Sequence, residues 1–192
     1  MSDTYKKIGL YGGTFDPVHI GHLLIAASVL ESKQLDRIIF IPSARPPHKS
    51  SDIMFGADAR LRMLEKAVDG DSRFAVSDIE LKRDGFSYTI DTIREMKKEY
   101  SDLTELFFIV GMDNLYEIEM WKNPRDIIKE SKVLAANRIC DESRPLPPWV
   151  VDNVEIVDVP LIEISSSDIR KRIHEGRSIK YLVPDAVYSE LK

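Results

Sequence analysis

Hydrophobic residues in this chain gather in short, nearly continuous runs, and polar turns or helical stretches separate one run from the next. Apolar runs of about four to eight residues are typical of parallel strands that are buried on both faces. This pattern predicts strands at residues 8–11, 37–41, 74–76, 106–110 and 132–136. Residues 154–159 alternate between apolar and polar side chains, which predicts an edge strand.

The stretches between the strands include segments with helical spacing. Residues 23–30 and 57–68 carry apolar side chains three and four positions apart, so each is predicted to be an amphipathic helix. Arg60 and Arg62 are expected on the solvated face of the second helix. Residues 77–83 either extend the preceding strand or form a sheet edge.

Two further helices have recognisable starts. Ser87 or Thr89 is a suitable N-cap for a helix that ends near Tyr100, and Pro124 begins the next one. The serines at positions 165–167 precede a last helix in the same way.

Strands that alternate with helices predict the α/β class. We expect a Rossmann-like, open, mainly parallel sheet of about five or six strands, with helices on both faces and a small C-terminal helical segment. At 192 residues the chain is too short for two ordinary domains, so residues 1–192 are expected to form one domain. The ligand crevice should lie at the carboxyl ends of the strands.

The composition of the chain excludes several classes of protein and of binding partner. Hydrophobic residues make up 43% and charged residues 31% of the chain, which is typical of a globular protein. A formal net charge of −5 argues against nonspecific binding of a nucleic acid polymer. The single cysteine cannot form an internal disulfide. Since residues 1–11 lack a leader pattern and no apolar run exceeds that at 106–110, neither a signal peptide nor a membrane span is predicted, and a cytoplasmic location is expected.

The first predicted strand leads directly into a glycine turn. Gly12 and Gly13 let a ligand approach the backbone, and the start of the following helix offers unpaired N–H groups that suit a phosphate. His19 and His22 are expected to share one face of the first helical turn. A simple tight turn or half of a metal site would also fit these residues. The spacing matches neither G-x-G-x-x-G nor a P-loop, and the distant Cys140 disfavours zinc.

Residues 12–22, Gly-Gly-Thr-Phe-Asp-Pro-Val-His-Ile-Gly-His, resemble the histidine-bearing motif of the nucleotidylyltransferase superfamily. The Gly-Gly-Thr-Phe-Asp-Pro form is typical of bacterial nicotinate mononucleotide adenylyltransferases. Residues 164–170, Ile-Ser-Ser-Ser-Asp-Ile-Arg, resemble the second motif of that family, with Ser167 in the place of a threonine. On local grounds these serines could equally be helix caps.

The resemblance implies roles for the residues of both motifs. Thr14, His19 and His22 are expected to be catalytic. The ATP-binding set comprises Gly12, Gly13, Thr14, Phe15, His19, His22, Ser165, Ser166, Ser167 and Arg170.

The segments between the motifs also resemble the family. A Pro-Pro-His-Lys loop is expected to supply Lys49, and His48 is left open, while Ser-Tyr-Thr, Gly-x-Asp and a tryptophan follow in order. The implied mononucleotide-binding residues are Lys49, Tyr88, Thr89, Gly111, Asp113 and Trp121. One segment departs from the pattern, because Arg138 is followed by Ile-Cys where the family usually has Pro-Gly, and its role is therefore open.

The resemblance implies adenylyl transfer from ATP to nicotinate mononucleotide, giving deamido-NAD and pyrophosphate, a step of NAD biosynthesis. Mg²⁺ is expected to arrive with ATP and to bridge its phosphates, without a protein metal site. Another phosphate acceptor, such as nicotinamide mononucleotide or phosphopantetheine, and a noncatalytic nucleotide-binding role are the alternatives. A homo-oligomer is left open.

Overall fold

The computed structural model describes residues 5–46, 53–137 and 145–192. Its centre is a sheet of six strands in the order β3-β2-β1-β4-β5-β6, and every neighbouring pair is parallel. The strands are β1 (Lys7–Gly13), β2 (Arg37–Pro42), β3 (Phe74–Val76), β4 (Glu105–Gly111), β5 (Lys132–Asn137) and β6 (Val154–Asp158). The predicted α/β class and parallel sheet are therefore confirmed, and β6 is an edge strand as predicted.

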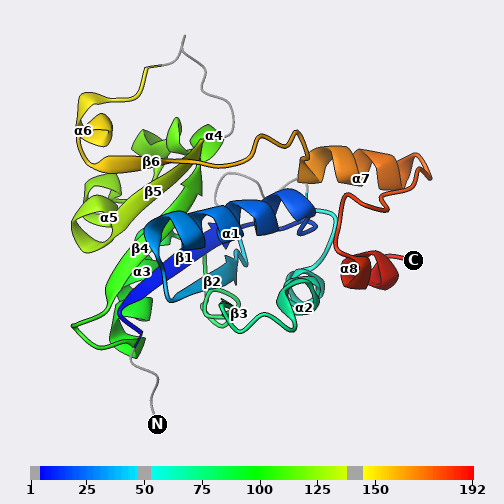
Figure 1. Cartoon of the computed structure of the whole chain (residues 1–192), viewed down its shortest axis with the longest axis horizontal. Coiled ribbons are helices and arrows are strands. Elements are labelled where there is room, and N and C mark those ends of the chain that lie inside the picture. Colours follow the sequence, from blue (N-terminus) through cyan, green and yellow to red (C-terminus); the bar gives the residue numbers. More distant parts are fainter. Residues whose placement is uncertain (1–4, 47–52, 138–144) are drawn as a thin grey trace.

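Helices cover both faces of this sheet (Figure 1). One face carries α1 (Ile20–Lys33) and α2 (Ala57–Val68), and α7 (Ser166–His174) and α8 (Asp185–Glu190) join the same hydrophobic cluster beyond the carboxyl ends of the strands. The other face carries α3 (Thr89–Glu99), α4 (Met112–Leu115), the 3₁₀ turn η1 (Ile118–Met120), α5 (Pro124–Glu130) and α6 (Pro148–Val151).

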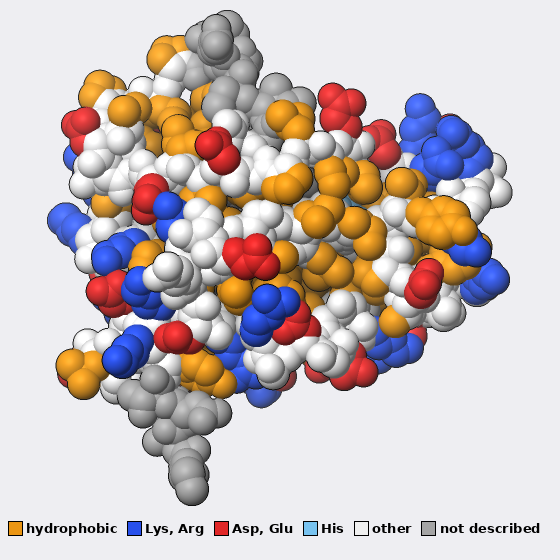
Figure 2. Space-filling model, viewed as in Figure 1, with side chains coloured by type: hydrophobic (Ala, Val, Ile, Leu, Met, Phe, Trp, Pro, Cys, Tyr) orange, Lys and Arg blue, Asp and Glu red, His pale blue; other side chains and the backbone are white. Residues whose placement is uncertain are grey.

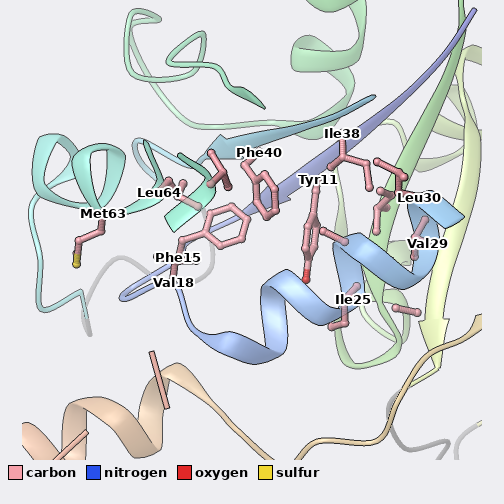
Figure 3. Packing of buried hydrophobic residues seen from close by; sticks show 14 of the residues in the cluster. Tyr11, Phe15, Val18, Ile25, Val29, Leu30, Ile38, Phe40, Met63 and Leu64 are labelled. Atoms are coloured by element: carbon pink, nitrogen blue, oxygen red, sulfur yellow. The ribbon is translucent and has the colours of Figure 1, made fainter. Parts of the chain in front are cut away.

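The two hydrophobic clusters follow from the period of two along each strand. In β1, Tyr11 points to the cluster under α1 and α2, whereas Ile8 and Leu10 point to the cluster under α3 and α5. Figure 3 shows the first cluster, in which the rings of Tyr11, Phe15 and Phe40 contact one another. Because helices cover both faces of the sheet, successive residues of its inner strands are apolar.

Two predictions about the ends of strands and helices are wrong. Residues 77–83 form turns instead of a strand, and a turn hydrogen bond joins the N–H of Leu81 to the Asp78 carbonyl. The N-cap of α3 is Tyr88, and neither Ser87 nor Thr89 has that position. His19 and His22 lie on the same side of the helix start, as predicted, although His19 is the N-cap of α1 and not part of its first turn, because its backbone is extended, with φ −141° and ψ 170°.

The C-terminal helices belong to the same hydrophobic cluster as α1 and α2. Glu190 of α8 forms ion pairs with Arg62 and Lys66 of α2, which ties the end of the chain to the body of the fold. Figure 2 shows basic side chains gathered at the outer end of α7, where Lys171 and Arg172 lie in its last turn. Within the described residues, none of the helices has the length and apolar character needed to cross a bilayer.

Candidate active site

A cavity of about 530 Å³ opens at the carboxyl ends of β1, β2 and β4, where a parallel sheet is expected to bind its ligand. Its volume is in the range of small-molecule sites. The cavity brings together every predicted site residue that the structure describes: Gly12, Gly13, Thr14, Phe15, His19, His22, Tyr88, Thr89, Gly111, Asp113, Trp121, Ser165, Ser166, Ser167 and Arg170.

The turn after β1 is shaped by Gly13 and Phe15. Phe15 has a left-handed backbone, with φ 48°, and its ring is buried against Tyr11 at a centroid distance of 5.6 Å. A Cβ atom on Gly13 would lie 2.9 Å from the Phe15 ring. Glycine at position 13 therefore allows Phe15 to fold back into the core, and the backbone of the turn then lines the cavity.

His19 and His22 form a stacked pair at the start of α1. Their ring centroids are 3.7 Å apart and their planes differ by 26°. The Nδ1 atom of His22 accepts a hydrogen bond of 3.2 Å from the backbone N–H of His19. A neutral imidazole whose Nδ1 is an acceptor carries its hydrogen on Nε2, so Nε2–H is the donor that His22 can offer to a ligand.

Arg60 is buried, with 1% of its surface exposed, and the prediction that it lies on a solvated helix face is wrong. Its guanidinium donates hydrogen bonds to the carbonyl oxygens of Thr14, at 2.7 Å, and Phe55, at 3.0 Å. Burial lowers the pKa of Arg60, and the nearby carboxylate of Asp16 opposes that shift. The burial of Arg60 could have been predicted from its spacing, since Arg60, Leu64 and Val68 follow one another at intervals of four residues and share the buried face of α2.

Asp16 is a second residue that the sequence analysis missed. Its carboxylate is 2% exposed and accepts hydrogen bonds from the backbone N–H groups of Met54, at 2.8 Å, and Phe55, at 2.9 Å. Asp16 thereby ties the motif after β1 to the segment that precedes α2.

The serine motif meets the first motif from the opposite side of the cavity. Ser165 is the N-cap of α7 and accepts a hydrogen bond of 3.0 Å from the N–H of Asp168. The hydroxyl of Ser166 donates to the Pro17 carbonyl oxygen at 3.0 Å. The capping role thus belongs to Ser165, while Ser166 joins the two motifs.

Arg170 lies one turn into α7 and points at the first motif. Its Nη1 donates to the Asp16 carbonyl oxygen at 2.9 Å, and its Nη2 donates to the Ser167 hydroxyl at 3.2 Å. An ion pair of 3.7 Å also joins it to the Asp16 carboxylate. These contacts hold the guanidinium beside the α1 and α7 N-termini, an arrangement that suits an anion.

Aromatic side chains form the other end of the cavity. Trp121 packs edge-on against Phe108, with centroids 6.0 Å apart, and Lys122 Nζ lies 4.6 Å from the centre of the Tyr88 ring. The hydrogen bonds of the described residues give the N–H groups of Tyr88 and Thr89, at the start of α3, no acceptor. This end therefore offers a stacking surface and two backbone donors.

Glu80 is a buried polar residue that contacts the first turns of α3. The carboxylate of Glu80 is 7% exposed and accepts a hydrogen bond of 2.6 Å from Thr92. The Ser87 hydroxyl oxygen accepts from the N–H groups of Ala44 and Arg45, at 3.0 and 3.2 Å, so Ser87 joins the loop after β2 to the start of α3. Burial raises the pKa of Glu80, while hydrogen bonds from Thr92 and Ser87 oppose the shift.

Gly111 and Asp113 lie where β4 passes into α4. The Asp113 carboxylate folds back over the backbone of Gly111, where a Cβ atom would collide with its Oδ1. Asp113 belongs to the first turn of α4. The glycine allows the carboxylate to stand at the end of the strand and to face the cavity.

Four residues named in the sequence analysis fall outside the described residues, namely His48, Lys49, Arg138 and Cys140. Within the described ranges, no group of three His, Cys, Asp or Glu side chains is arranged to hold a metal ion.

The fold and the two joined motifs define a nucleotide-transferring class of protein, and comparison with known families agrees. The family model described as cytidylyltransferase-like matches residues 10–172, and the chain belongs to this family.

Its curated relatives are more specific. The chain is 47% identical over 181 residues to "Probable nicotinate-nucleotide adenylyltransferase" of Exiguobacterium sibiricum, which covers 94% of this chain and 93% of that protein. It is 37% identical over 191 residues to the protein of the same name from Lachnoclostridium phytofermentans, with 96% and 95% covered. The family resemblance predicted from the two motifs is therefore confirmed.

A solved structure supports the fold. Plasmodium falciparum nicotinic acid mononucleotide adenylyltransferase complexed with NaAD superimposes with a TM-score of 0.76 at 18% identity, covering 97% of this chain and 95% of that one. The predicted Rossmann-like arrangement is confirmed by this likeness.

Proposed function

We propose that this protein transfers the adenylyl group of ATP to nicotinate mononucleotide, giving deamido-NAD and pyrophosphate in NAD biosynthesis. The observation that carries the proposal is that both motifs and the aromatic residues line one cavity. The curated relatives of this chain are named for the same activity. The phosphate oxygen of the mononucleotide would attack the α-phosphorus of ATP in line, so the chemistry needs no protein nucleophile.

The phosphates would lie between the two motifs. The backbone of residues 12–15 and the Thr14 hydroxyl would align the reacting phosphates, and the Nε2–H of His22, with His19 stacked on it, would donate to the charge that develops there. Ser165, Ser166, Ser167 and Arg170 would hold the outer phosphates of ATP at the start of α7.

Mg²⁺ is proposed to arrive bound to the triphosphate. The residues fit that mode of entry, because the Asp16 carboxylate beside the phosphate end is already engaged by two backbone N–H groups. Phosphate oxygens, and not protein side chains, would be the ligands of the ion. The ion would neutralise phosphate charge, and the chain's residues would orient the groups that react.

The pyridine ring would lie at the aromatic end. Trp121 would stack on the ring, and the N–H groups of Tyr88 and Thr89 would donate to its carboxylate. Asp113, and Lys49 from the loop after β2, complete the proposed mononucleotide-binding set. A carboxylate accepts from both donors, whereas an amide would turn its own NH₂ toward one of them, so the acid should be preferred.

The test is an assay of pyrophosphate release from ATP and Mg²⁺ with a panel of acceptors. We expect nicotinate mononucleotide to exceed nicotinamide mononucleotide by about 10²-fold or more in kcat/KM. Equal values for the two mononucleotides would contradict the ring-end assignment. Turnover with phosphopantetheine, or binding of ATP without turnover, would contradict the proposed activity.

A further inference from the structure

We infer that Lys122 strengthens the preference for an acidic over an amide pyridine ring, because among the residues that the structure describes it is the cation at the aromatic end of the cavity. This inference rests on the proposed function and adds to it the residue that distinguishes the two mononucleotides by charge. The backbone donors of Tyr88 and Thr89 can fix the direction of the ring substituent, but they are neutral.

The charges that line the cavity are unevenly placed. Among its described residues, the carboxylates are Asp16, Glu80, Asp113 and Glu117, and the cations other than histidine are Lys122 and Arg170. Arg170 is bonded to Asp16 at the phosphate end, so Lys122 is the positive charge available to a group at the ring end.

The ring end would repel an anion without that charge. Glu80 stands behind the start of α3, bonded to Thr92, and Glu117 precedes η1, which leads to Trp121. Both carboxylates line the cavity. These carboxylates would weaken the binding of a ring carboxylate relative to a neutral amide, and a nearby cation would offset that repulsion and add to the preference from the backbone donors.

Lys122 is held where it can supply this charge. Its Nζ donates a hydrogen bond of 2.8 Å to the Asp91 carboxylate in the first turn of α3, and it lies 4.6 Å from the centre of the Tyr88 ring. An ammonium group has three N–H donors, so Lys122 can keep Asp91 as a partner and still donate to a ligand. The contact with Tyr88 holds it over the residue whose backbone N–H faces the proposed carboxylate.

The size of the effect of Lys122 on the acid-to-amide ratio depends on how exposed its side chain is. Lys122 is 42% exposed, so solvent weakens its interaction with an anion but does not abolish it. Hydrogen bonds to a charged acceptor are roughly twice as strong as those to a neutral one. Loss of the cation should therefore reduce the acid-to-amide ratio of kcat/KM by about tenfold.

The experiment compares Lys122→Met with wild type, using nicotinate mononucleotide and nicotinamide mononucleotide as separate substrates. Methionine keeps an unbranched side chain of similar length and removes the charge. We expect kcat/KM to fall about tenfold for the acid and less than about twofold for the amide, and Lys122→Arg to restore most of the ratio. Lys129→Met is the matched control, because Lys129 is 75% exposed on α5 and pairs with Asp126 away from the cavity.

Asp91→Asn provides the opposite perturbation. It removes the carboxylate that is paired with Lys122, so the acid-to-amide ratio of kcat/KM should stay the same or rise. Ionic strength is a separate test, because salt screens the charge of Lys122. The ratio should therefore fall as ionic strength increases in wild type but not in Lys122→Met. Equal losses for both substrates in Lys122→Met, or an unchanged ratio, would overturn the inference.

Calorimetric dissociation constants for the two mononucleotides separate this inference from the proposed function. If wild type binds the acid more tightly and Lys122→Met reduces that preference about tenfold, the role of Lys122 holds even when no adenylyl transfer is detected. If wild type binds both with equal affinity, the inference fails whether or not transfer occurs.

Discussion

The guanidinium of Arg60 donates a hydrogen bond of 2.7 Å to the carbonyl oxygen of Thr14, which lies 46 residues earlier in the chain. Arg60 also bonds the Phe55 carbonyl, and Asp16 accepts the N–H groups of Met54 and Phe55. The motif after β1 and the start of α2 are thereby held together by buried polar groups. Arg60 is a positioning residue, since it acts on the cavity through the backbone of Thr14.

Arg60→Met should lower the free energy of unfolding by about 2–4 kcal/mol, because it leaves two buried carbonyl oxygens without their charged donor. Urea denaturation with the linear extrapolation measures this change. Arg62→Met is the matched control on the same helix. Arg62 is 55% exposed and pairs with Glu190 at 3.4 Å, so its loss should cost less than about 1 kcal/mol. Equal losses in the two variants would contradict the positioning role.

His22→Ala should lower kcat by about 10²-fold, because it removes the Nε2–H donor from the charge that develops on the phosphates. ATP binding should change much less, since the outer phosphates are assigned to the serine motif. His174→Ala, in the exposed last turn of α7, is the control and should keep wild-type turnover. Wild-type kcat in purified His22→Ala would make the first motif a purely structural turn.

Arg170→Ala should raise the KM for ATP with a smaller effect on kcat, because a guanidinium on the outer phosphates contacts the ground state and the transition state alike. Lys171→Ala changes the same charge at the next, exposed position and should leave both constants near wild type. Steady-state kinetics at varied ATP and saturating mononucleotide distinguishes these results. A large fall in kcat with an unchanged KM would contradict the assignment.

Glu80→Gln should remove one contribution to stability that decreases as pH rises. Burial raises the pKa of Glu80 above its ordinary value of 4.5, so the folded state holds this proton more tightly than the unfolded state does. The folded protein therefore loses stability as pH rises from the unfolded value through the folded one. Glutamine does not titrate, so the free energy of unfolding of Glu80→Gln minus that of wild type should increase as pH rises from 4.5.

Urea titrations at a series of pH values measure that difference. Glu119→Gln serves as a control, because Glu119 lies in η1 and does not line the cavity. A difference between Glu80→Gln and wild type that is constant over the whole range would show that Glu80 has the same proton affinity in both states.

Much of the fold was readable from the sequence because it depends on local chemistry. The apolar runs predicted β1 to β5, since a parallel strand buried on both faces needs apolar side chains at successive positions, and the alternation at residues 154–159 predicted the edge strand β6. The bounds of α2 were predicted at Ala57–Val68, and Pro124 begins α5 as expected. The motif residues were readable for the same reason, because turns and helix starts use few residue types.

The polar residues behind the cavity were not readable in this way. A single arginine among apolar positions does not reveal whether it meets water or two carbonyl oxygens, and only the packing of α2 against the turn after β1 decided that Arg60 is buried. The same holds for Ser87, whose expected role as a cap gave way to the N–H groups of Ala44 and Arg45.

The sequence by itself determined which segments become strands and helices and which residues carry the motifs, because spacing and side-chain type suffice for both. Tertiary structure alone decided which charges meet. Lys122 and Asp91 lie 31 positions apart, and Arg170 and Asp16 lie 154 positions apart, yet an ion pair joins each of the two pairs. Electrostatic interactions depend on distance in space and on burial, and a folded sheet brings together carboxyl ends of strands that the chain keeps far apart.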